Sequence, residues 1–386
     1  MFAERMSRLG TETAFEVLAR AKQLEREGRT IIHLEIGEPD FDTPAYIRQA
    51  ACDALESGWT HYGPSPGDPE LREAIAEDVS KSRGCQVALE EVVVVPGAKP
   101  IIFFGILALV DEGDDVIYPN PGFPIYESVI DFVGARSVPV PLREENQFRL
   151  DVEELAGLVT PKTKMIIINS PENPTGSVVT LEDLEAVARL AVERDIWIMT
   201  DEAYSRMVYD GEHYSIIALP GMRERTILLD CFSKTYAMTG WRLGYGVAPA
   251  EVTAAMAKLE TNCNSCTPSF IQRAGIAALR GPQEESDAMM AEFKRRRDVI
   301  VEGLNSLPGV SCIMPGGAFY AFPNVKATGV DSRTLAKRIL EEAGVAVLSG
   351  TAFGEYGDGY LRLSYANSVE NLNAAVAAMG ELLATL

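Results

Sequence analysis

The sequence has few basic residues relative to acidic ones. Of its 386 residues, 35 are Lys or Arg and 56 are Asp or Glu, which gives a formal net charge of -21 at pH 7. Such a surface repels nucleic acids and anionic membranes, because both carry negatively charged phosphates. We therefore expect neither partner, and any anion that the protein binds must be held by a local group of cations.

Long hydrophobic runs are also missing. The longest apolar run spans residues 101–110, roughly half of the ~20 residues that a helix needs to cross a bilayer. Residues 1–28 are charged throughout and contain no apolar stretch of signal-peptide length. We therefore expect a cytoplasmic protein with no membrane-spanning segment, and a buried helix at residues 101–110.

Cysteine and histidine are scarce. The 6 cysteines are too few, in a chain of this length, for a disulfide-stapled secreted domain, so we expect reduced thiols. Cys263 and Cys266 form a CxxC pair, but a single pair without a second one or a nearby histidine is a weak signal for a metal or redox site. The three histidines lie far apart along the chain. We expect no metal site.

From about residue 90, short β-branched runs alternate with longer helical patterns. This alternation predicts an α/β protein with a mostly parallel central sheet covered by helices. Several runs are almost entirely apolar, which is typical of strands buried on both faces. The predicted strands are Val92 to Val95, Asp115 to Tyr118, Lys164 to Asn169, Trp197 to Asp201, Thr226 to Asp230 and Leu243 to Ala248.

Two predicted helices help to define the domain organisation. One runs from Thr180 to about Arg194, where a cation suits the helix dipole. A long charged helix at residues 284–305 separates the sheet region from a tail of strands and two helices. We place a domain boundary in this helix, with residues 45–295 as a large domain and residues 1–44 and 296–386 as a smaller α+β domain. The helix before Gly28 is expected to pack on the smaller domain.

Lys234 follows the predicted strand at residues 226–230, in the segment CFSKTYAMTGWRLGYG. Loops at this edge of a sheet often present reactive groups. A lysine amine is a nucleophile only when deprotonated, and a second cation such as Arg242 would lower its pKa. A lone Ser-Lys pair is more often a surface lysine before a turn, so other segments must decide.

Asp201 ends the apolar strand IWIMT, and Tyr204 follows it closely. A carboxylate there can face a ligand, although an Asp at a strand end is more often a helix cap. In the segment VVVVPGAKP, Gly97 and Ala98 lead into an apolar helix, an arrangement that suits a phosphate at the positive end of the helix. The spacing is not that of a P-loop, and no strand-linked GxGxxG occurs, so a kinase or dinucleotide-binding protein is disfavoured.

Two further segments contain polar candidates. NSPENPTG, residues 169–176, is dense in turn formers and is either a plain loop or a loop whose Asn173 amide holds a ligand oxygen. YLRLSYA alternates like a strand and places Arg362 on the face opposite Leu361 and Leu363. Arg362 then either holds a carboxylate in two hydrogen bonds or forms a surface salt bridge.

Taken together, these segments resemble a known family. GEPDFDTP, HYGPSPGDPELREAIA, PGAK, NPTG, DEAY, SKTYAMTGWRLGYG and RLSYA occur in the order and spacing of the class I and II aminotransferases of pyridoxal phosphate fold type I. The resemblance covers nearly the whole chain and is greatest to the bacterial aspartate aminotransferase-like branch. It implies pyridoxal 5′-phosphate as cofactor, amino acid and 2-oxo acid substrates, and a homodimer with shared active sites.

The resemblance also implies roles for individual residues. Lys234 would be the internal aldimine and proton carrier, Asp201 the partner of the protonated ring nitrogen, and Tyr204 a donor to the ring hydroxyl. Asn173 would donate to the same hydroxyl and contact substrate, and Arg362 would clamp the α-carboxylate. The remaining implied contacts are a backbone contact of Gly37 to substrate, stacking of Phe123 on the ring, and a phosphate site of Gly97, Ala98, Lys99, Ser233, Arg242 and Tyr62 of the other subunit.

The sequence departs from the family pattern at three of these places. Cys231 stands where related enzymes often have a phosphate-binding serine, so the share carried by Ser233 is open. Ala98 replaces the second small glycine of the phosphate loop, a change that backbone N–H binding tolerates. Phe123 stands where an aromatic residue with a polar group is common.

The implied activity is transfer of an amino group between an L-amino acid and a 2-oxo acid by a ping-pong mechanism. The same scaffold also supports a lyase, a decarboxylase or an oxidase, because sequence does not decide which bond to Cα is broken. A non-catalytic regulator that binds the cofactor is a further alternative, although the chain has no basic DNA-binding appendage. No arginine is assignable to a second substrate carboxylate, so we favour a neutral or aromatic donor with 2-oxoglutarate or pyruvate as acceptor and keep aspartate open.

Overall fold

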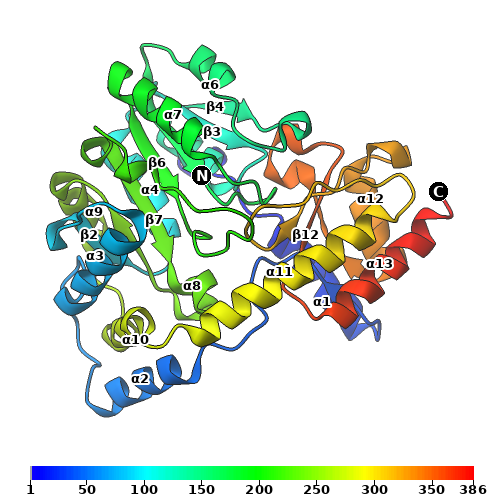
Figure 1. Cartoon of the computed structure of the whole chain (residues 1–386), viewed down its shortest axis with the longest axis horizontal. Helices are drawn as coiled ribbons and strands as arrows, with labels where there is room; N and C mark the ends of the chain where they lie inside the picture. Colours follow the sequence, from blue (N-terminus) through cyan, green and yellow to red (C-terminus); the bar gives the residue numbers. More distant parts are fainter. Residues whose placement is uncertain (1) are drawn as a thin grey trace.

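A seven-stranded sheet forms the centre of the protein in the computed structural model, which describes residues 2–386 (Figure 1). Its strand order is β2-β8-β7-β6-β5-β3-β4. The strands are β2 (Val92–Val95), β3 (Asp115–Asn120), β4 (Arg136–Pro141), β5 (Thr163–Asn169), β6 (Trp197–Asp201), β7 (Thr226–Cys231) and β8 (Gly244–Val247). The pairs within β4-β3-β5-β6-β7 are parallel, and β8 is antiparallel to both of its neighbours. The predicted α/β fold with a mostly parallel sheet is confirmed.

All six predicted runs form strands of this sheet, but the sequence analysis did not predict the seventh strand, β4. β4 contains Pro139 and Pro141, and proline reads as a strand breaker because it has no backbone N–H to donate. The strand is tolerated because β4 lies at the edge of the sheet, where one side of the backbone needs no partner.

Helices cover both faces of the sheet, as the apolar runs predict. In β2, Val93 and Val95 contribute to one hydrophobic cluster, and Val92 and Val94 contribute to another on the opposite face. The first face is covered by α4 (Lys99–Leu109), α5 (Ile125–Val133) and α9 (Ala250–Cys263). The second face is covered by α2 (Ala45–Glu56), α3 (Pro69–Arg83), α6 (Val152–Leu158), α7 (Leu181–Arg194) and α10 (Ser269–Arg280).

The predicted helices are present at their expected positions. α7 begins after Thr180, whose hydroxyl accepts a hydrogen bond from the Asp183 N–H in a capping box. The long charged helix is α11 (Glu284–Asn305), which runs from the sheet region toward the C-terminal part (Figure 1). The apolar run at residues 101–110 lies mostly in α4, whose Ile101 and Ile102 are buried. No helix described in residues 2–386 is long and apolar enough to cross a membrane.

The C-terminal part forms a further hydrophobic cluster in which α11 takes part, and this cluster also includes Tyr204 and Cys231 of the sheet region. The C-terminal part contains β9 (Tyr320–Ala321), β11 (Leu348–Ser349), β12 (Leu361–Ser364), α12 (Ser332–Arg338) and α13 (Val369–Leu383). The short strand β1 (Ile32–His33) pairs with β10 (Val345–Ala346), so the N-terminus joins this part. α1 (Ala14–Arg26) packs there too, as expected, through Leu24 against Leu340 and through an Arg20–Glu341 ion pair of 2.7 Å. The two-domain division itself stays a prediction.

Candidate active site

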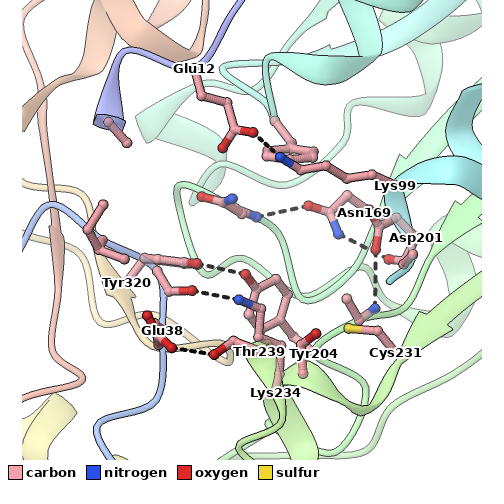
Figure 2. A pocket seen from close by; sticks show the side chains of 18 of the residues that line it. Glu12, Glu38, Lys99, Asn169, Asp201, Tyr204, Cys231, Lys234, Thr239 and Tyr320 are labelled. Atoms are coloured by element: carbon pink, nitrogen blue, oxygen red, sulfur yellow. Dashed lines mark hydrogen bonds and ion pairs between the residues drawn. The ribbon is translucent and has the colours of Figure 1, made fainter. Parts of the chain in front are cut away.

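A cavity of about 510 Å³ lies where the carboxyl ends of β5, β6 and β7 face β9 and β12 of the C-terminal part (Figure 2). Parallel pairing places Asn169 of β5 opposite Asp201 of β6, and Cys231 ends the next strand. The carboxyl ends of parallel strands are the usual place for a ligand in such sheets.

The sequence-predicted site residues converge on this cavity with two exceptions. Those that line it are Gly37, Ala98, Lys99, Phe123, Asn173, Asp201, Tyr204, Ser233, Lys234, Arg242 and Arg362. Gly97 lies immediately beside it, because a Cβ built on Gly97 would collide with the Arg242 guanidinium. Tyr62 is 90% exposed and belongs to a separate surface hollow with Trp59 and His61. Within one chain, therefore, Tyr62 is not part of the site.

Lys234 lies on the single turn α8 (Phe232–Thr235), which begins directly after β7. Its Nζ donates a hydrogen bond of 2.5 Å to the carbonyl oxygen of Gly37 (Figure 2). Burial lowers the pKa of this amine. Cys231 and Glu38 oppose the shift, and the positive charges of Arg362 and Arg242 add to it. The amine is thus easier to deprotonate than an ordinary lysine, as a nucleophile requires.

Asp201 is a buried carboxylate held from two directions. Its Oδ2 accepts a hydrogen bond of 2.6 Å from the Tyr126 hydroxyl, and its Oδ1 accepts one of 3.2 Å from the Ala203 N–H. Burial raises the pKa of Asp201 to about 6, with the two hydrogen bonds acting in the opposite direction. The group therefore stays ionised at neutral pH and can pair with a cationic ligand atom. Sequence reasoning did not single out Tyr126, although it lies in the same segment as Phe123.

Tyr204 forms a pair with Tyr320, a residue that sequence reasoning missed. Their hydroxyl oxygens are 2.7 Å apart, and their rings meet edge to face with centroids 5.7 Å apart. Tyr320 lies on β9, far along the chain, and its hydroxyl occupies the space beside Gly37 where any Cβ would collide. Gly37 is thus required for the close approach of two distant segments.

One end of the cavity is suited to an anion. Gly97 has a φ of +79°, which glycine adopts without strain, and it precedes the N-terminus of α4. The positive end of this helix, the buried Ser233 hydroxyl and the Arg242 guanidinium lie around this end of the cavity. Backbone N–H groups, a hydroxyl and a guanidinium are the donors that typically hold a phosphate.

Two buried polar atoms that belong to cavity-lining residues have no hydrogen-bond partner in the described chain. They are Nε of Arg362 and Oδ1 of Asn173. Arg362 is otherwise fixed by donating to the Glu35 carbonyl oxygen and by lying 4.7 Å from the Tyr320 ring centroid. An unpaired buried polar group costs about 1–3 kcal/mol, so these two atoms indicate where a polar ligand would bind.

Behind the cavity wall lies a second group of buried charges, which we name the Arg83 cluster: Arg83, Ser205, Glu202, His213 and Asp230. Arg83 Nε lies 2.8 Å from Glu202 Oε2, and Arg83 Nη2 lies 2.8 Å from Asp230 Oδ2. Burial by itself raises the pKa of Glu202, but Arg83 and His213 outweigh it and lower the pKa to about 2. Sequence reasoning missed this cluster, because Arg83 looks like an ordinary last-turn residue of a helix.

Comparison with known proteins identifies the architecture. The family model "Aminotransferase class I and II" matches residues 29–379. An aspartate aminotransferase of Pyrococcus abyssi is 45% identical over 359 residues, covering 92% of each chain. The aromatic-amino-acid aminotransferase 2 of Thermococcus litoralis is 44% identical over 357 residues, again covering 92% of each.

Solved structures agree with the sequence relatives. The aromatic aminotransferase from Pyrococcus horikoshii OT3 superposes with a TM-score of 0.90 at 43% identity, covering 95% of this chain and 99% of that one. The aspartate aminotransferase from Thermus thermophilus with maleate superposes with a TM-score of 0.94 at 39% identity, covering 99% of both chains.

Proposed function

The chain belongs to the class I and II aminotransferases, and from that premise we propose that it transfers amino groups between amino acids and 2-oxo acids by a ping-pong mechanism. In this proposal, Lys234 Nζ holds pyridoxal 5′-phosphate covalently. One observation carries the proposal: a lysine with a lowered pKa, a buried carboxylate and a buried arginine, Lys234, Asp201 and Arg362, line one cavity although they come from three distant segments.

The residues present fit this cofactor at each of its polar groups. The anion-binding end near Gly97, Ser233 and Arg242 suits the phosphate. The ionised Asp201 suits the ring nitrogen. The Asn173 side chain lines the same cavity, where its NH2 group can donate to the ring hydroxyl and its unpartnered Oδ1 can accept from a ligand. Phe123 would stack on the ring. Pyridoxal phosphate, when bound, supplies the electron sink that stabilises negative charge at Cα.

Each protein group then has a distinct task. Asp201 would favour a protonated ring nitrogen by charge pairing, and Tyr126 holds the carboxylate in place by a hydrogen bond. Arg362 uses its unpartnered Nε to hold the substrate carboxylate, which fixes the orientation of Cα. Lys234 would carry the proton of the substrate Cα, because its amine has a lowered pKa and lies on the turn directly after β7.

A homodimer completes the proposed site. Tyr62 is 90% exposed, and Leu55 and Trp59 nearby also expose large apolar side chains. Exposed aromatic and aliphatic groups of this kind are typical of an interface. In the dimer, Tyr62 of the other subunit reaches the phosphate.

We also propose that residues 45–295 form the cofactor-binding domain and that residues 1–44 with 296–386 form the smaller domain.

The names of the relatives leave the substrate open. They include aspartate and aromatic aminotransferases and, at 40% identity, an arginine–pyruvate transaminase of Pseudomonas aeruginosa. We propose an amino acid donor with a neutral or aromatic side chain and 2-oxoglutarate or pyruvate as acceptor, and we keep aspartate as the alternative donor.

A half-reaction experiment tests the proposal. The protein loaded with pyridoxal phosphate is incubated with each of the twenty amino acids in turn, with no acceptor present, and oxo acid is measured. We expect one preferred class of donor to yield about one oxo acid per subunit and then stop, until pyruvate or 2-oxoglutarate restarts turnover. Continuous oxo acid formation without an acceptor would contradict amino transfer and indicate an oxidase or a lyase. Protein without cofactor is the control.

A further inference from the structure

An ion pair spans the rim of the cavity between two segments that are distant in sequence. Glu12 lies just before α1, and Lys99 is the first residue of α4. The Lys99 ammonium pairs with Glu12 Oε1, and both side chains line the cavity (Figure 2). The side chain of Glu12 is 19% exposed and that of Lys99 is 44% exposed, so the pair is partly shielded from water.

Lys99 was expected at the phosphate site, which it can serve through its backbone N–H at the first position of α4. Its ammonium pairs with Glu12 instead and has no task in the proposed function. Four cationic side chains line the cavity: Lys99, Lys234, Arg242 and Arg362. In the proposed function the last three serve the covalent link, the phosphate and the α-carboxylate. Lys99 Nζ lies 5.4 Å from the centroid of the Phe123 ring, the ring expected to stack on the cofactor. Its ammonium is therefore the group available to meet a substrate side chain.

The segment that carries Glu12 also supplies apolar surface. Ala14 and Phe15 directly follow on α1 and line the same cavity, as does Ile36. A substrate with an uncharged side chain can contact this surface and leave the Glu12–Lys99 pair intact. A substrate with a second carboxylate must displace Glu12 from Lys99 and then lies close to the displaced carboxylate, which repels it.

We propose that Glu12 determines substrate class by neutralising Lys99, and that it thereby disfavours donors and acceptors that carry a second carboxylate. The inference rests on the proposed function and deepens it. It selects amino acids with uncharged side chains and monocarboxylic oxo acids over dicarboxylic ones. Specificity arises here from a repulsive element as well as from apolar contact.

The test uses the protein loaded with pyridoxal phosphate and two unreactive substrate analogues without an amino group. Succinate represents a dicarboxylic substrate, and 3-phenylpropionate represents an uncharged side chain. Their dissociation constants are measured by titration calorimetry in wild type and in Glu12→Gln. We expect succinate to bind about three- to tenfold more tightly in Glu12→Gln, and the affinity for 3-phenylpropionate to change by less than about twofold. The kcat/KM ratio of aspartate to phenylalanine should rise in parallel.

Two further variants sharpen the test. Glu16→Gln removes the same charge from an exposed position on α1 outside the cavity lining, and it should leave both affinities unchanged. Lys99→Met should abolish the gain that Glu12→Gln produces, because the ammonium that receives the second carboxylate is gone. An unchanged succinate affinity in Glu12→Gln, an equal gain for both analogues, or a gain that persists with Lys99→Met would each overturn the assignment of Glu12.

Failure of the proposed function gives a different result. Arg362→Lys should weaken both analogues, since both present the carboxylate that Arg362 holds. If wild type binds neither analogue, or if Arg362→Lys changes neither affinity, the proposed substrate site is wrong. If both analogues bind and both depend on Arg362, the proposed substrate site stands. The change in the ratio of the two dissociation constants on Glu12→Gln then tests the role of Glu12 alone.

Discussion

Two groups of buried charges lie at the carboxyl ends of β6 and β7 and differ in how completely they are paired. The cavity group comprises Asp201, Lys234 and Arg362, and the other is the Arg83 cluster. In the Arg83 cluster, both oxygens of Glu202 and of Asp230 have partners. Among the described residues, the unpartnered buried atom of the Arg83 cluster is His213 Nδ1, and that of the cavity group is Arg362 Nε, which belongs to a residue that lines the cavity. The carboxylates of the Arg83 cluster are thus saturated by protein groups, whereas Arg362 offers an unpaired donor to the proposed ligand.

Neighbouring residues can belong to different groups because successive side chains at a strand end point to opposite sides. Asp201 lines the cavity, and Glu202, the next residue, contacts Arg83 of α3. Asp230 of β7 likewise contacts Arg83, whereas Lys234, on the turn that follows β7, lines the cavity. One structural edge thus carries a binding site on one side and its structural support on the other.

Removal of Lys234 should produce the largest functional change. Lys234→Ala is expected to lower amino transfer at least ~10⁴-fold, since it removes both the covalent link and the proton carrier. The free energy of unfolding should change little, because the side chain makes only one hydrogen bond. Turnover assays and urea unfolding check both parts. Lys258→Ala, on the exposed face of α9, is the matched control. Normal turnover, or a retained absorbance band of the lysine-bound cofactor, would refute the role.

Removal of Arg83 should produce the opposite pattern. Arg83→Met leaves the buried Asp230 without its guanidinium partner and Glu202 with His213 alone, and we expect the free energy of unfolding to fall by about 3–5 kcal/mol. Urea unfolding measures this loss. Arg189→Met, which breaks an exposed pair with Glu185, should cost less than about 1 kcal/mol. Equal losses in the two variants would show that the Arg83 cluster is not a structural support.

The pH dependence of the free energy of unfolding should distinguish Glu202 from Asp201. We expect these changes to be smaller than the loss caused by Arg83→Met. The pKa of Glu202 is lowered from 4.5 to about 2, so its ionised form stabilises the protein above pH 4.5, and this contribution is lost as pH falls toward 2. The pKa of Asp201 is raised from 3.8 to about 6. Its neutral form therefore favours the folded state below pH 3.8, and that contribution is lost as pH rises through 6.

Unfolding free energies of cofactor-free wild type, Glu202→Gln and Asp201→Asn from pH 2 to pH 8 check these signs. Between pH 2 and 4.5, wild type should gain stability relative to Glu202→Gln as pH rises. Between pH 3.8 and 6, it should lose stability relative to Asp201→Asn. Parallel curves for the two variants would mean that the neighbouring carboxylates share one environment. Glu16→Gln, at an exposed position, should follow wild type throughout.

Local patterns in the sequence predicted much of this site. Six of the strands follow from β-branched runs, and alternation in YLRLSYA correctly placed Arg362 opposite Leu361 and Leu363, which lie in the core. Tyr126, Tyr320 and Glu12 were not found in this way. Each acts through a partner 75 to 116 residues away along the chain, and no local pattern marks such a contact.

Hydrophobic periodicity in the sequence predicted most of the helices and strands, because it acts over a few neighbouring positions. The roles of the site residues came instead from the resemblance of several ordered motifs to the aminotransferase family. Periodicity failed for β4, since only its place at the sheet edge makes its prolines tolerable. The tertiary structure alone decided which charged groups have hydrogen-bond partners within the protein and which do not. Pairing depends on which segments meet in space, and burial then sets the free energy of each charge through its distance from water and from its partner.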